Sequence, residues 1–406
     1  MQTRIPKEIL NTYAGERADR ILRSCVHCGF CTATCPTYQL LGDELDSPRG
    51  RIYLIKQMLE GEVPTRKTLS HLDRCLTCRS CETTCPSGVQ YAQLLDIGRK
   101  VAEDNTQRSI IDRLKRNILH WILSKPARFK RLYTLGSKFN PILPAKFRIE
   151  LARPKNEIFK AQKHTRKVLL LQGCVQPTLQ PNINLATEKV FDHIGIEVTT
   201  LNEIECCGAI SHHLNKHEQA QRTFRHNIDT WWPYINDGYE AIISNASGCG
   251  ITLKDYANYL EHDPGYADKA KKISSMVKDV SEIISDSDIN QLNQLKQAKV
   301  TRVAFHAPCT LQHGLRLTTK VEQMLTVLGF QLLPVSGSHL CCGSAGTYSI
   351  LQPKLSKQLK QQKLANLSNE SPDYILTANI GCQQHLQQGN SIPVKHWIEL
   401  IAENIN

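Results

Sequence analysis

Cysteines at two short, repeated spacings are the residues of this chain best suited to chemistry. Each run reads C-x2-C-x2-C-x3-C-P, the spacing typical of bacterial [4Fe–4S] ferredoxins. Three thiolates spaced in this way can reach three corners of a cubane from one short loop, and the proline sends the fourth cysteine elsewhere. The runs consist of Cys25, Cys28, Cys31 and Cys35 before Pro36, and of Cys75, Cys78, Cys81 and Cys85 before Pro86.

The runs predict two clusters that exchange their fourth ligand, as in two-cluster ferredoxins. One cluster is assigned to Cys25, Cys28, Cys31 and Cys85, and the other to Cys75, Cys78, Cys81 and Cys35. Two zinc ribbons are the alternative, because they also use paired C-x2-C motifs. Three cysteines within seven residues, followed by a Cys-Pro and repeated in full, fit zinc poorly. We therefore expect two [4Fe–4S] clusters that lie close together and act as a short wire.

A second cysteine pattern occupies the rest of the chain and repeats once. A single cysteine precedes a Cys-Cys-Gly sequence by 32 residues, and another single cysteine follows. Such thiols can bind a further metal or cluster, but redox dithiols and buried apolar pairs remain open. His306 and His385 lie near these cysteines, and a structural role is favoured for both. The two sets are Cys174, Cys206, Cys207 and Cys249, and Cys309, Cys341, Cys342 and Cys382.

Short apolar runs precede the outer cysteines of both repeats. They read VLLL before Cys174, AIIS before Cys249, VAF before Cys309 and YILT before Cys382. Helical patterns lie between them, over residues 185–195 and 321–329. Strands that alternate with helices predict two α/β modules, each with a small parallel sheet. The cysteines would follow the carboxyl ends of the strands, where open α/β sheets bind ligands.

These patterns predict an α+β multidomain protein. A mainly helical, ferredoxin-like two-cluster domain is followed by two repeated α/β modules, named CCG modules after their Cys-Cys-Gly sequences. The helical domain includes a predicted helix within Pro48–Gly61. A basic connector follows it, with an amphipathic helix over Ile111–Leu123. The expected borders are 1–105 for the helical domain, 106–165 for the connector, and 166–295 and 296–406 for the CCG modules.

The composition limits the class and the location of the protein. Hydrophobic residues make up 41% and charged residues 22%, which is the range of globular proteins. The N-terminus has no export-type apolar run, so the 16 cysteines are expected to be metal ligands in the cytoplasm rather than disulfides. No apolar stretch reaches the roughly 18 residues of a membrane span. We expect at most a peripheral position on the inner face of the cytoplasmic membrane.

The net charge of +12 is concentrated between residues 113 and 167. Such a charge suits nucleic acid, an anionic membrane or an acidic partner. An iron–sulfur nucleic-acid protein is disfavoured because no recognisable nucleic-acid fold is present. For the helix over Ile111–Leu123, packing against a partner subunit or against the chain's own domains is slightly favoured over a position on the membrane surface with Trp121 at the interface.

The motifs that would bind an organic redox cofactor are missing. The sequence has no G-x-G-x-x-G after a strand, no P-loop and no Ser/His/Asp arrangement. We therefore assign no catalytic residue and no flavin or nicotinamide site. An electron carrier of this kind implies that the substrate is oxidised on another polypeptide.

The sequence resembles the iron–sulfur subunits of membrane-associated flavin dehydrogenases. These include subunits of glycolate oxidase, anaerobic glycerol-3-phosphate dehydrogenase and lactate utilisation, with heterodisulfide reductase more distant. The similarity covers essentially the whole chain and is strongest to the glycolate oxidase members. It is carried by SCVHCGFCTATCPTYQLLGDELDSPRGRIYLIKQ, HLDRCLTCRSCETTCPSGVQY, SGCG, HLCCGSAGTYS and TANIGCQQH.

The resemblance implies an electron-transfer subunit of a hetero-oligomeric oxidoreductase that is not catalytic alone. An FAD-containing partner would oxidise glycolate, or D-lactate, to the 2-oxo acid, and membrane quinone would be the acceptor. A glycerol-3-phosphate or lactate dehydrogenase subunit is the alternative. A thiol–disulfide reductase is less favoured, because Cys249-Gly-Ile-Thr252 and Cys382-Gln-Gln-His385 lack the closing C-x2-C of heterodisulfide reductase.

Overall fold

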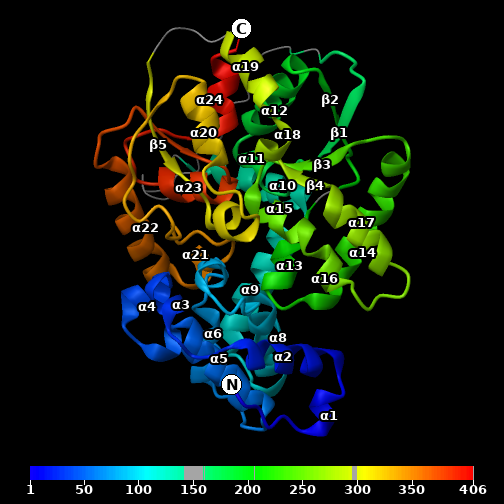
Figure 1. The fold of residues 1–406 in the computed structure, drawn as a ribbon, viewed down its shortest axis with the longest axis vertical. Helices are drawn as coiled ribbons and strands as arrows, with labels where there is room; N and C mark the ends of the chain where they lie inside the picture. The colour runs from blue at the N-terminus through cyan, green and yellow to red at the C-terminus, as the bar shows by residue number, and fades with distance from the viewer. Residues whose placement is uncertain (141–158, 160, 205, 295–299, 406) are drawn as a thin grey trace. The chain divides into compact units, whose positions relative to one another are not determined.

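The computed structural model describes residues 1–140, 159, 161–204, 206–294 and 300–405 (Figure 1). It divides the chain into two compact units that do not follow the predicted domain borders, so those borders stay predictions. Residues 141–158 and 160 of the predicted connector lie outside the described residues. Unit 1 comprises Met1–Lys115, Ala307–Leu317 and Ser336–Asn366, and unit 2 comprises Arg116–His306, Thr318–Val335 and Leu367–Asn406.

Unit 1 is helical, as predicted for the N-terminal domain, and no strand occurs among its described residues. Two further helices, α9 (Ile110–Leu123) and α22 (Pro353–Ser368), each continue from unit 1 into unit 2. The elements of unit 1 are α1 (Lys7–Leu10), α2 (Tyr13–Ser24), α3 (Phe30–Ala33), α4 (Pro36–Leu41), the 3-10 turn η1 (Glu44–Asp46), α5 (Pro48–Leu59), α6 (Arg66–Asp73), α7 (Ser80–Thr84), α8 (Tyr91–Asn105), the π-turn η3 (Thr310–Gly314) and α21 (Tyr348–Leu351).

Helices α2, α5 and α8 form the core of unit 1. The Ser47 hydroxyl caps α5 by accepting a hydrogen bond from the Gly50 N–H at 2.9 Å, and Pro48 occupies the first turn. Ile55 on α5 is fully buried, as is Leu94 on α8. The helices approach closely because Gly98 of α8 has no side chain: a Cβ there would lie 2.5 Å from Ile55. The predicted helix within residues 48–61 is confirmed.

Unit 2 contains two four-stranded parallel sheets with the same topology. The strand orders are β2-β1-β3-β4 and β6-β5-β7-β8. The four apolar runs in the sequence correspond to β1, β3, β5 and β7, so the prediction of two repeated α/β modules is confirmed. The strands are β1 (Arg166–Leu170), β2 (Ile196–Thr200), β3 (Ala241–Ser244), β4 (Val277–Asp279), β5 (Arg302–His306), β6 (Gln331–Leu332), β7 (Tyr374–Thr377) and β8 (Val394–His396).

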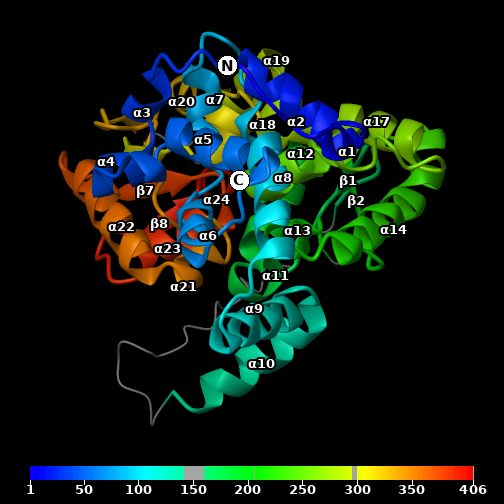
Figure 2. The same cartoon turned by 90° about the horizontal axis from the view of Figure 1, so that it is seen from below.

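Helices cover both sheets of unit 2, and α12 packs against α24 (Figure 2). The predicted helices over 185–195 and 321–329 are confirmed as α12 and α20. The helices of unit 2 are α10 (Pro126–Lys138), α11 (Gln176–Leu179), α12 (Asn182–His193), α13 (Ala209–His213), α14 (His217–Asn236), α15 (Ser247–Lys254), α16 (Tyr256–Tyr259), α17 (Ala267–Met276), α18 (Val280–Ile283), α19 (Asp286–Gln294), α20 (Lys320–Val327), α23 (Ile380–Gln387) and α24 (Trp397–Glu403).

Helix α9 confirms the predicted amphipathic helix, but its apolar face lies largely in solvent. The exposed fractions are 67% for Ile111, 57% for Leu114, 47% for Ile118 and 53% for Trp121. The Arg128 guanidinium of α10 lies over the Trp121 ring, 4.4 Å from its centroid. No helix in the described part of the chain is long and apolar enough to cross a membrane.

Candidate metal centres

The first three cysteines of the first run line one pocket of unit 1. Cys25 ends helix α2, Cys28 is exposed, and Cys31 lies on α3. Cys85, the last cysteine of the second run, lines the same pocket. The structure therefore brings together the four residues predicted for the first cluster, although their ligation of iron stays a prediction. We call this cavity the exposed pocket, because Cys28 reaches solvent.

The second run lines a neighbouring pocket of unit 1, which we call the buried pocket. Cys75, Cys78 and Cys81 lie there with Cys35 from the first run. Cys35 and Cys81 are only 7% and 8% exposed. The structure thus also brings together the four residues predicted for the second cluster. Tyr91 and Cys81 line both cavities, so the two pockets are adjacent.

The backbones of the two runs adopt the same unusual conformation. His27 and Thr77 have φ values of 57° and 54°, and the next left-handed residues are Gly29 at 88° and Arg79 at 60°. Left-handed φ is costly for residues with a side chain, by roughly 1–2 kcal/mol. Repetition of this strained path in both runs indicates that the loop shape itself is required, as expected for a loop that wraps a cluster.

The spacing of the sulfur atoms favours clusters over single zinc ions. Tetrahedral zinc with Zn–S bonds of about 2.3 Å holds its sulfurs ~3.8 Å apart. Among the described residues, no three thiols of the two runs have their sulfur atoms within 4.8 Å of one another. A four-iron core separates its thiolates more widely than a single ion does. In the part of the chain that the structure describes, the thiols of the two runs therefore do not form the compact group that a single zinc ion requires.

Burial controls the protonation of the pocket thiols. Burial raises the pKa of Cys31 to about 11, and the neighbouring Cys25 adds to the effect. Burial also raises the pKa of Cys78 and of Cys81. Thiols of this kind are protonated at neutral pH, whereas iron binds thiolates. Loading of either pocket must therefore release protons, and the positive iron core compensates the buried negative charge.

The first repeat gathers all four of its cysteines at the carboxyl ends of its strands. The pKa of Cys206 is lowered because the Cys174 and Cys207 thiols donate hydrogen bonds to it, and the Gly208 N–H donates at 3.3 Å. Cys207 also interacts with Cys249 on helix α15. This shared hydrogen bonding makes Cys206 the thiolate of the group, an arrangement that suits metal binding or redox chemistry.

The second repeat places its cysteines in both units. In unit 1, the sulfur atoms of Cys309 and Cys341 lie 3.7 Å apart. Cys342, the residue after Cys341, is also buried. Leu76 and Cys78 of the second run pack against the same apolar cluster as Cys309 and Cys341. These thiols of the repeat therefore lie beside the buried pocket, which the sequence alone did not predict.

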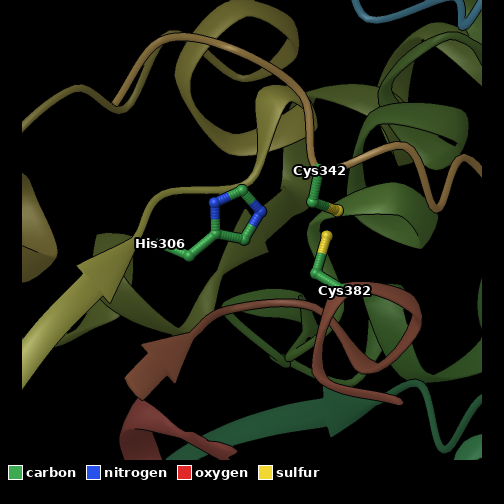
Figure 3. A group of neighbouring side chains, drawn as sticks. All are labelled: His306, Cys342 and Cys382. Atoms are coloured by element: carbon green, nitrogen blue, oxygen red, sulfur yellow. The ribbon is translucent and has the colours of Figure 1, made fainter. Parts of the chain in front are cut away.

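In unit 2, Cys382 lies on α23 and faces His306 at the end of β5 (Figure 3). Its sulfur lies within 4.8 Å of a His306 ring nitrogen. His385 is one turn further along α23 and joins no compact group of potential ligands among the described residues. Of the two histidines considered from the sequence, the structure brings only His306 to a cysteine.

Comparison with known proteins gives two domain matches. Residues 21–89 match the 4Fe-4S dicluster domain. Residues 168–254 and 303–387 each match the cysteine-rich domain named CCG. The first match includes the cysteines of both pockets, and the second pair covers the first three strands of each repeated sheet, β1 to β3 and β5 to β7.

Three relatives extend the comparison beyond the separate domains. The chain is 49% identical to the glycolate oxidase iron-sulfur subunit of Escherichia coli, over 99% of both chains. It is 28% identical to the probable glycolate oxidase iron-sulfur subunit of Bacillus subtilis, over 94% of this chain and 92% of the relative. Lactate utilization protein A of an Exiguobacterium species is 26% identical over 59% of this chain and 98% of its own length.

Proposed function

Because the chain belongs to the family of glycolate oxidase iron–sulfur subunits, we propose that it takes electrons from a flavin partner that oxidises glycolate and passes them toward a membrane quinone. The protein is an oxidoreductase subunit with two [4Fe–4S] clusters, and the FAD belongs to another subunit. D-lactate is the second substrate that we propose for the complex. A partner that oxidises lactate only is the alternative, favoured by the likeness to lactate utilization protein A.

The pair of adjacent pockets is the observation that carries this proposal. Each pocket gathers the four cysteines predicted for one cluster, three from one run and the fourth from the other, and Cys81 lines both pockets. When bound, the clusters supply one-electron carriage, which a flavin dehydrogenase needs in order to release its two electrons singly. The chain itself holds the two sites next to each other through Cys81 and Tyr91, and it leaves Cys28 at the surface.

The assignment predicts that glycolate reduces iron in this chain. The complex with its native partners, purified without oxygen, should contain about eight irons and eight sulfides per copy of this chain. Glycolate should produce the EPR signal of reduced [4Fe–4S] clusters, and D-lactate should do so more weakly. Glycerol 3-phosphate serves as the control substrate and should give no signal. A complex with zinc in place of iron, or one that only lactate reduces, would contradict the assignment.

The thiols of the two repeats are proposed as a further metal or cluster site. The sets are Cys174, Cys206, Cys207 and Cys249, and Cys309, Cys341, Cys342 and Cys382. The hydrogen-bonded first set and the 3.7 Å approach of Cys309 to Cys341 support this proposal. An iron content clearly above eight, lowered toward eight by Cys206→Ser, would be the expected sign of it. A content of eight that Cys206→Ser leaves unchanged would count against it.

Helix α9 is proposed to hold the complex on the inner face of the cytoplasmic membrane. Its exposed Ile111, Leu114, Ile118 and Trp121 form one apolar face, and basic side chains flank them. Amphipathic helices of this composition lie in the interface of anionic bilayers.

We expect Ile118→Glu to release at least half of the complex from washed membranes, because it places a charge in the apolar face. Val327→Glu is the matched control: Val327 is 49% exposed, similar to Ile118, but lies on α20. The fraction that sediments with membranes is the measurement. If Ile118→Glu instead separates the flavin partner and leaves this chain on the membrane, α9 binds the partner. Equal sedimentation of all forms would exclude the helix as an anchor.

A further inference from the structure

The two pockets differ in the charges and donors that surround them. Both are proposed to hold the same [4Fe–4S] group, so a difference between their reduction potentials must come from the protein. Cluster potentials depend on local charge, hydrogen bonds to sulfur and solvent exposure. Each of these three factors can be read from the residues of unit 1.

A buried arginine lines the buried pocket. Arg51 on α5 is 1% exposed and lies in the cavity with Cys35 and Cys75. Its guanidinium donates to the Asp46 carboxylate at 3.3 Å and to the His71 carbonyl at 2.7 Å. An arginine guanidinium stays charged in proteins, and the Asp46 carboxylate beside it stabilises that charge. The side chain is therefore a permanent cation next to the pocket thiols.

The Asp46 carboxylate holds Arg51 in place. Asp46 is 0% exposed and also accepts from Arg74 at 2.7 Å. Asp43, whose carboxylate lies within 4.8 Å of that of Asp46, offsets the charge of the partly exposed Arg74. His71, whose Nδ1 lies 3.0 Å from Asp46, adds a further polar contact. Because Arg51 itself is enclosed by protein and lines the pocket, its field acts there with little screening by water.

Hydrogen-bond donors add to the charge. The Tyr91 hydroxyl donates to the Cys75 sulfur at 3.7 Å, and the Thr77 N–H donates to it at 3.4 Å. The Thr37 hydroxyl lies 3.3 Å from the Cys35 sulfur. Tyr91 is 4% exposed, and its hydroxyl points its donor at the sulfur rather than at solvent.

The exposed pocket has a backbone donor too, since the Arg49 N–H donates to the Cys31 sulfur, but it differs in its side chains. Its arginine, Arg49, is two residues before Arg51 on the same helix, but it is solvent-accessible and pairs with Glu44 at 2.7 Å. That pair has no net charge. Among the described residues, no side chain donates a hydrogen bond to the sulfur atoms of Cys25, Cys28, Cys31 or Cys85.

We propose that Arg51 and Tyr91 make the buried pocket the site of higher reduction potential. Reduction adds one electron and no proton to the group in the pocket, so its negative charge increases by one. A buried cation and a donor to sulfur stabilise that charge, whereas the side chains of the exposed pocket offer only a neutral, solvated ion pair. The inference rests on the proposed function, since it requires that both pockets are loaded.

An EPR-monitored titration of the complex tests the proposal, with dithionite as the reductant. Wild-type protein should show two one-electron waves, the upper one from the buried pocket. The comparison is made at the midpoint potential of the upper wave in the wild-type protein. There, Arg51→Gln should lower the ratio of reduced to oxidised cluster in the buried pocket at least tenfold, which corresponds to a fall in midpoint potential of ~59 mV for a one-electron couple. Tyr91→Phe should lower the same ratio about threefold, and Arg51→Lys should restore most of the ratio because it keeps the charge. The lower wave should not move.

Arg49→Gln is the matched control, and it should change either ratio less than twofold. If Arg51→Gln fails to fold, Tyr91→Phe decides the question, because it removes one hydroxyl and leaves the packing intact. A shift of the lower wave, or no shift of the upper wave with Tyr91→Phe and Arg51→Gln, would overturn the assignment of the upper wave. Protein without two waves and about eight irons would instead refute the proposed function, and the two failures are therefore distinct.

Discussion

Cys35→Ser should remove the cluster of the second run and spare that of the first. Cys35 is the last cysteine of the first run, yet it lines the buried pocket with Cys75 and Cys78. A serine hydroxyl is a poor replacement for a soft thiolate ligand of iron. We expect iron to fall from about eight to about four per chain, with loss of the upper wave in the redox titration. Transfer of electrons from glycolate to quinone should fall to background.

Double substitutions separate this exchange of ligands from the simpler arrangement in which each run binds its own cluster. Cys35→Ser combined with Cys75→Ser should still leave about four irons, because both changes affect one pocket. Cys35→Ser combined with Cys25→Ser should leave none. If each run bound its own cluster, these two results would be reversed, so the iron content of the two double variants decides between the models.

Cys85→Ser supplies the reciprocal test and the control for general damage. It should resemble Cys28→Ser, because both residues line the exposed pocket. The variant should keep the upper wave and lose the lower one. If all three single variants lost both clusters, the pockets would depend on each other for folding, and ligand exchange would have to be tested by spectroscopy of partly loaded protein.

Much of this fold follows from local patterns in the sequence. The apolar runs before Cys174, Cys249, Cys309 and Cys382 became strands because four or five buried residues between polar ends suit a parallel sheet. The 32-residue spacing from a single cysteine to a Cys-Cys pair occurs twice and predicted two equivalent modules. The two sheets have the same strand order, as that prediction requires. The predicted sets of four cysteines are brought together in two pockets, because loop spacing fixes three of each set.

The surroundings of the pockets were harder to predict. Arg51 is the example: an arginine near a helix start usually lies in solvent. The helical spacing in the sequence did indicate that Arg51 is buried. Arg51 precedes Ile55 and Met58 by four and seven residues, so it lies on the same buried face of the helix. Its partner Asp46 and the nearby Tyr91 come from other elements, so no local pattern connects them. The packing of Cys309 and Cys341 against Leu76 is likewise a contact between distant segments, beyond the reach of a local pattern.

The glycine that follows each Cys-Cys pair has a structural reason that the sequence did not reveal. Gly208 and Gly343 have φ values of 85° and 88°, in the left-handed region. Gly343 also lies against helix α22: a Cβ there would be 2.8 Å from the Ser356 carbonyl oxygen and 2.9 Å from the Leu359 Cβ. The Ser356 hydroxyl donates to the Gly343 carbonyl at 2.8 Å, which holds the two segments together.

Gly343→Ala should therefore destabilise the part of unit 1 that carries Cys341 by about 3 kcal/mol, combining left-handed strain with a backbone clash. Gly346→Ala is the matched control, since Gly346 has φ of 61° but nothing within 4 Å of an added Cβ. It should cost only about 1 kcal/mol. Hydrogen exchange of amides in residues 336–366 measures the local opening that each change causes. Equal loss of protection in both variants would mean that the clash with α22 is relieved, and that backbone conformation alone explains the glycine of the Cys-Cys-Gly sequence.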